Sequence, residues 1–149
     1  MLQAGRWRGR GSLLTPGRSL GAAVECEVAI EREEGAANLT GHWREEGQPP
    51  VEFSLRVAQN EEGIWSLVAL AGALRLQGTA KLDSPPNLAL LWNDPGNLNL
   101  TAALFAITGG FGCRGFVRDG DRVRTWEIAF RLKQEVLRGP NVVSLHRRR

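Results

Sequence analysis

The chain has 149 residues, of which 42% are hydrophobic, and this combination fits one folded domain and excludes general disorder. The longest apolar runs have the length of a β-strand and fall far short of the roughly 20 residues that a membrane-spanning helix needs. The net charge of +3 comes from the ends, because residues 22–137 hold all 16 acidic residues and 11 of the 19 basic ones. We therefore expect a mildly acidic body between two basic segments.

Residues 1–21 open the chain with four arginines and no acidic residue. The apolar run of a secretory signal is missing from this segment. The arginines are Arg6, Arg8, Arg10 and Arg18. We expect a flexible basic segment outside the folded domain, in a cytoplasmic protein. An Arg-rich start without acids also fits an organellar import segment, and that alternative stays open.

From Ala22 onward, apolar and polar residues alternate with a period of two, which is typical of strands with one face in water. Pairs such as Asp119-Gly120 and Pro95-Gly96 punctuate the runs as turns. No connection is long enough for a crossover helix, so neighbouring strands should be antiparallel. The predicted strands are 22–32, 36–44, 51–58, 64–70, 73–82, 87–92, 98–107, 113–118 and 122–133.

Eight or nine such strands predict an all-β domain, a single antiparallel β-barrel over residues 22–133, because closure removes the open edges. Residues 134–149 follow as a C-terminal segment with a basic tail. Basic ends can hold nucleic acid. The body, however, lacks a basic stripe with interleaved aromatic residues, so we expect no specific nucleic-acid partner and no membrane span. A homo-oligomer is among the expected states.

Metal and cofactor chemistry finds little support in the sequence. The cysteines Cys26 and Cys113 form no CxxC motif, and the histidines His42 and His146 lie far apart. We therefore expect reduced cysteines, no metal site and no cofactor. The chain also shows no catalytic triad and no nucleotide-binding loop, which disfavours an ordinary hydrolase or transferase.

The aromatic residues of the strands are the candidates for a ligand-binding interior. A small barrel has an interior that is either packed solid or wide enough for one small ligand. The predicted ligand-binding residues are Phe53, Trp65, Trp92, Phe105, Phe111 and Trp126. Since strand aromatics usually form the core, a filled barrel that serves as a structural or interaction module is the alternative.

Two carboxylates share one face of the first predicted strand. Glu25 and Glu27 flank Cys26. If that face pointed into the barrel, burial could raise the pKa of one carboxyl and make it an acid or base. If it faced water, the pair would be a solvated surface, and Val24, Cys26 and Val28 form the better inward set.

Residues 103–112 read ALFAITGGFG and precede Arg114-Gly115-Phe116. This segment resembles the "LAITGGTG" strand and turn of the allene oxide cyclase and dirigent barrel superfamily. Residues 72–79, GALRLQGT, resemble an upstream strand of the same group, so the resemblance covers about residues 64–118. Phe111 stands where that group has threonine, and the chain contains no tyrosine to match a family pocket.

The resemblance implies a barrel that binds a small apolar ligand and steers the cyclisation or coupling of a reactive unsaturated substrate, as an isomerase or cyclase. Glu27 then corresponds to the active-site glutamate, although Ala29 replaces the expected asparagine. The glycines Gly109, Gly110 and Gly112 form a structural turn at a barrel corner. Residues 41–43, Gly-His-Trp, resemble the Gly-x-Trp of lipocalins and imply a non-catalytic carrier as the alternative.

Overall fold

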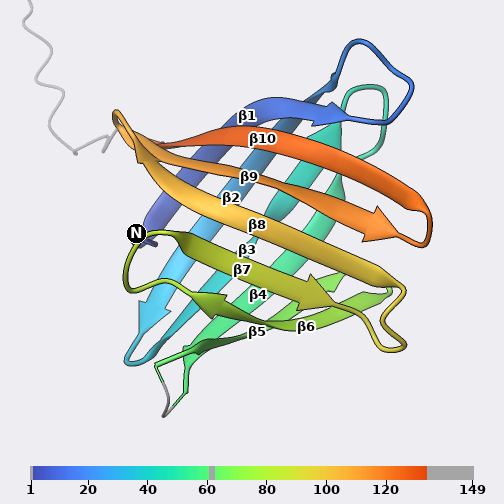
Figure 1. Cartoon of the computed structure of the whole chain (residues 1–149). Helices are drawn as coiled ribbons and strands as arrows, with labels where there is room; N and C mark the ends of the chain where they lie inside the picture. Colours follow the sequence, from blue (N-terminus) through green and yellow to red (C-terminus); the bar gives the residue numbers. More distant parts are fainter. Residues whose placement is uncertain (1, 61–62, 134–149) are drawn as a thin grey trace, which may run out of the picture.

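The computed structural model describes residues 2–60 and 63–133, and this part of the chain forms ten β-strands (Figure 1). Each strand pairs antiparallel with the next along the chain, and the first pairs with the last, so the sheet closes into a barrel. The strands are β1 (Gly5–Leu14), β2 (Ala22–Glu33), β3 (Ala36–Glu45), β4 (Val51–Gln59), β5 (Trp65–Ala71), β6 (Leu74–Lys81), β7 (Asn87–Trp92), β8 (Leu98–Ile107), β9 (Gly110–Asp119) and β10 (Arg122–Leu132). The predicted all-β antiparallel barrel is confirmed.

The number of strands and the role of the first 21 residues need correction. The nine predicted strands correspond to β2–β10, and the tenth, β1, lies in the segment that we expected to be flexible. β1 pairs with β2 along one edge and with β10 along the other, so it closes the barrel. The barrel therefore begins at Gly5 and not at Ala22. The predicted C-terminal segment, residues 134–149, lies outside the described residues.

Glycines hide the alternating pattern of β1. Trp7 and Leu13 are buried, and Gly9 and Gly11 share their inward phase. A Cβ atom at Gly9 would lie 2.6 Å from the Phe130 ring of β10. The missing side chain thus lets Phe130 lie across β1, a use of glycine that is typical of strongly bent barrel strands.

Two clusters of inward-facing side chains form the core. The first lies where β1, β2, β9 and β10 meet, and there the Phe111 ring stacks on Phe130 at 4.8 Å and meets Trp7 edge-on at 5.1 Å. The second cluster is aliphatic, and its members are Ala37, Val57, Leu67, Leu76, Ala80 and Leu91 of β3–β7. The aromatic half and the aliphatic half of the interior face each other across the barrel.

Candidate functional site

A cavity of about 300 Å³ lies inside the barrel between these two clusters. Its walls come from inward positions of β2–β10 and from Leu2, which precedes β1. The lining residues are Leu2, Cys26, Val28, Ile30, Leu39, Phe53, Leu55, Val57, Leu67, Ala80, Leu82, Ala89, Leu91, Leu100, Ala102, Leu104, Phe111, Cys113, Trp126 and Phe130. All of them are apolar apart from the two thiols, so the cavity favours an apolar occupant.

Three of the six predicted ligand-binding residues line this cavity, namely Phe53, Phe111 and Trp126. Trp65 lies near one end of the barrel, where its indole nitrogen donates a hydrogen bond to a carboxylate oxygen of Asp83 at 3.3 Å. It lines a smaller depression of about 110 Å³, which shares Leu2, Val57 and Leu82 with the lining of the main cavity. Trp65 is therefore placed at an end of the barrel and not beside the central cavity.

Trp92 and Phe105 lie on the outer wall. Their neighbours Leu91 and Leu104 line the cavity, and successive residues of a strand point to opposite faces. The Phe105 ring covers Gly112 on β9, and the Arg114 guanidinium lies 4.6 Å from its centroid. Phe105 thus fills the space that Gly112 leaves open on the outside of the barrel. Of the three glycines predicted to form the turn, Gly109 lies in it with a φ of 74°, whereas Gly110 and Gly112 belong to strand β9.

Cys26 and Cys113 are the ionisable residues among those that line the cavity, and both are free thiols. Burial raises the pKa of Cys26 to about 12, with smaller contributions from Cys113 and Glu27. Burial also raises the pKa of Cys113, and a side-chain hydrogen bond with Trp126 acts in the opposite direction. Both groups are therefore neutral thiols at pH 7, and the cavity presents no charge to an occupant.

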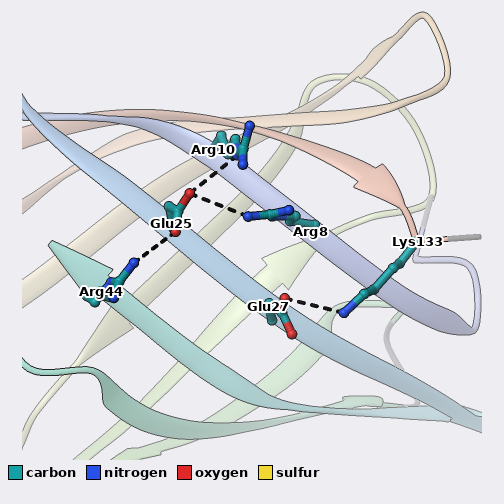
Figure 2. Close-up of polar contacts among 6 residues, drawn as sticks. All are labelled: Arg8, Arg10, Glu25, Glu27, Arg44 and Lys133. Carbon is teal, nitrogen blue, oxygen red and sulfur yellow. Dashed lines mark hydrogen bonds and ion pairs between the residues drawn. The ribbon is translucent and has the colours of Figure 1, made fainter. Parts of the chain in front are cut away.

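Glu27 and Glu25 point away from the cavity (Figure 2). The Glu27 carboxylate lies 3.4 Å from the Lys133 ammonium, and its side chain is 45% exposed. Glu25 lies among the guanidinium groups of Arg8, Arg10 and Arg44, at 3.5, 3.4 and 3.0 Å. The structure thus places both carboxylates in the solvated surface that sequence analysis gave as the alternative, and each exposed ion pair contributes roughly 1 kcal/mol or less.

The two ends of the barrel differ in polarity. At the end that carries the β2–β3 and β6–β7 turns, Leu2 packs against residues of both core clusters (Figure 1). At the other end, Arg124 of β10 and Glu45 of β3 form an ion pair at 3.5 Å. A depression of about 640 Å³ adjoins Arg124 there. One end of the cavity is therefore covered by an aliphatic side chain and the other by charged residues.

Leu2 and most of the aliphatic lining were not among the predicted ligand-binding residues. The inward phase of each strand contains the signal for the lining residues, because Cys26, Val28 and Ile30 repeat with a period of two. Leu2 has no such signal, since it belongs to no strand. The described residues contain no group of three or more metal-ligating side chains and no helix that could span a membrane.

The cavity and the strand order define the class of this protein as a closed ten-stranded antiparallel barrel with an apolar interior. No family model and no curated protein matches the sequence. Similar solved structures include a de novo designed fluorescence-activating β-barrel (15% identity, 89% of this chain and 94% of that one, TM-score 0.46). Others are a chain bound to DFHBI (11%, 89% and 94%, 0.46) and a redesigned β-barrel (15%, 90% and 93%, 0.43). Likeness at this level does not bear on function.

Proposed function

We propose that the barrel binds one small apolar molecule in its interior. The observation that carries the proposal is the cavity of about 300 Å³ with its neutral, apolar lining. This volume lies at the lower end of the range of small-molecule sites. Left empty, a cavity of this size leaves its lining atoms without packing partners on one side, which is unfavourable. An apolar occupant would restore much of that packing.

Titration with an apolar fluorescent dye, such as N-phenyl-1-naphthylamine, tests the proposal. Ala102 lines the cavity, and its neighbour Ala103 on β8 points outward. Ala102→Leu fills part of the cavity and should weaken dye binding roughly tenfold, whereas Ala103→Leu adds the same carbons outside and should leave it unchanged. Equal effects of the two variants, or no dye binding by the parent protein, would contradict the proposal.

Native mass spectrometry of the protein from its own source complements the dye. A co-purified small molecule supports the carrier, and a specific oligomer without ligand supports the structural module. The two outcomes distinguish a cavity that holds a ligand from an interior that functions without one.

Steering of a cyclisation or coupling is the finer form of this proposal. It rests on the resemblance of residues 64–118, and the cavity would contribute orientation and exclusion of water. Acid–base help from Glu27 is not part of it, since that carboxylate lies on the outer wall. Turnover of an unsaturated epoxide that Ala102→Leu abolishes would support a cyclase, and binding without turnover would support a carrier.

A further inference from the structure

The outward-pointing residues of β5–β9, from Ser66 to Arg118, form a face that we call the β5–β9 wall. Eight large apolar side chains are exposed among the described residues, and four of them lie on this wall. They are Leu70, Leu88, Leu90 and Phe116, between 40% and 49% exposed. Exposed apolar side chains that form a contiguous patch can mark an interaction surface, whereas single scattered ones need no explanation.

Strand pairing joins three of these side chains, Leu88, Leu90 and Phe116, into one patch. Leu90 of β7 pairs with Thr101 of β8, which in turn pairs with Phe116 of β9. Leu88 and Trp92 lie two residues to either side of Leu90 and point the same way. The apolar side chains therefore run along β7 and extend across β8 to β9.

The charge on the β5–β9 wall has one sign. Its outward positions include Arg75, Lys81, Arg114 and Arg118 and no acidic residue. Lys81 pairs with Leu88 from one side, and Arg114 lies two strands away on the other side. Arg114 also reaches Glu127 on β10, at the margin of the wall, at 3.4 Å. Cations thus flank the apolar patch on both sides.

The opposite wall is different. The outward positions of β2–β4 mix acids with bases, and Glu25 and Glu27 are in ion pairs with arginine and lysine there. Cations of β1, β3 and residue 133 lie beside Glu25 and Glu27 on that side of the barrel. On the β5–β9 wall, the carboxylate partner of Arg114 lies at the margin, on β10. The two faces of the barrel are therefore unlike in both polarity and charge.

A second copy of the chain fits the β5–β9 wall poorly. In a two-fold symmetric contact the same patch meets itself, so the flanking cations of both copies would face one another. The wall of a closed barrel is also convex, which limits its contact with a rigid protein. A lipid surface with anionic headgroups avoids both problems, because it attracts the cations and deforms around a convex wall. The apolar side chains can enter the headgroup region while the cations contact the headgroups.

We propose that the β5–β9 wall docks the protein on an anionic lipid surface. Leu88, Leu90 and Phe116 enter the interface, and Lys81 and Arg118 contact acidic headgroups. Binding should therefore need both anionic lipid and the apolar patch, and it should weaken as salt rises.

Flotation of the full chain with vesicles tests this proposal. The vesicles are phosphatidylcholine alone or an equimolar mixture of phosphatidylcholine and phosphatidylserine. We expect binding to the mixed vesicles only. Arg118→Glu should weaken it roughly thirtyfold, because a charge reversal counts as two surface charges at about 1 kcal/mol each. Leu90→Ser should weaken it about tenfold through the lost apolar burial.

Matched controls change the same chemistry elsewhere. Leu20 is 82% exposed in the β1–β2 connection, and Arg18 lies in the same connection. Leu20→Ser and Arg18→Glu should leave vesicle binding within about twofold of the parent. Circular dichroism confirms that each variant keeps the fold.

Three results would overturn the proposal. One is the absence of binding by the parent chain to either kind of vesicle. Another is binding that Leu90→Ser and Arg118→Glu leave unchanged, since the basic ends and not the wall would then be responsible. The third is a dimer in size-exclusion chromatography that Leu90→Ser dissolves, because the patch would then belong to a second copy.

Discussion

At the scale of single residues, burial decides the chemistry of the cavity. Cys26 is 5% exposed and faces an interior that contains no cation among its lining residues. Thiolate reactivity requires ionisation, and burial disfavours the ionised form of both thiols, at Cys113 by more than the hydrogen bond with Trp126 favours it. The two cysteines therefore act as small apolar groups in the cavity wall.

The raised pKa of Cys26 predicts a loss of stability in alkali. Its ordinary pKa of 9.0 applies to the unfolded chain, whereas burial keeps the folded thiol protonated up to about pH 12. Ionisation thus favours the unfolded state, and the free energy of unfolding should fall as pH rises from 9 towards 12. Cys26→Ala removes this contribution, so its melting temperature should decline less steeply over that range. A parallel decline in the parent protein and the variant would contradict the assignment.

Single residues also show why only part of the site could be predicted. Phe53 alternates with Glu52 and Ser54, so the phase of β4 is unambiguous and Phe53 points inward. β7 and β8 are apolar on both faces. There, Trp92 follows Leu91 and Phe105 follows Leu104, so the sequence alone cannot say which of each pair points inward. The exposed apolar patch on β7 is the reason for this ambiguity.

At the scale of elements, β1 is the strand that the sequence conceals. The other nine strands follow from alternation and from turn residues, and their predicted bounds agree with the structure within three residues. β1 alternates as well, but glycines occupy two of its inward positions and arginines its outward ones. The inward space beside Gly9 is filled by the Phe130 side chain of β10. The apolar signal for this part of β1 therefore lies in the sequence of β10 and not in that of β1.

Removal of β1 should therefore open the barrel. A chain that lacks residues 2–14 loses the strand between β2 and β10 and leaves both with unpaired edges. We expect it to aggregate or to show no cooperative melting by circular dichroism. Trp7→Ala should cost about 3–5 kcal/mol, whereas Arg10→Ala should cost less than about 1 kcal/mol because Arg10 is exposed. An unchanged melting temperature of the shortened chain would show that β1 is dispensable.

At the scale of the whole molecule, a closed barrel with an internal cavity raises the question of how an occupant enters. Pairing is continuous around the barrel, so the ends are the available routes. At one end Arg124 and Glu45 form an ion pair. An apolar molecule that passed there would have to separate or desolvate charges, which costs more than displacing an aliphatic side chain.

Entry past Leu2 is therefore expected. Leu2 packs against residues of both core clusters and lines the main cavity and the smaller depression beside Trp65. Its displacement exposes one leucine, which costs about 1.5–3 kcal/mol. Leu2→Ala should lower that barrier and raise the dissociation rate of an apolar dye roughly tenfold in stopped-flow measurements. Leu20→Ala, at the other end of the barrel, is the matched control and should leave the rate unchanged. If Arg124→Ala accelerated dissociation and Leu2→Ala did not, the route would lie at the charged end.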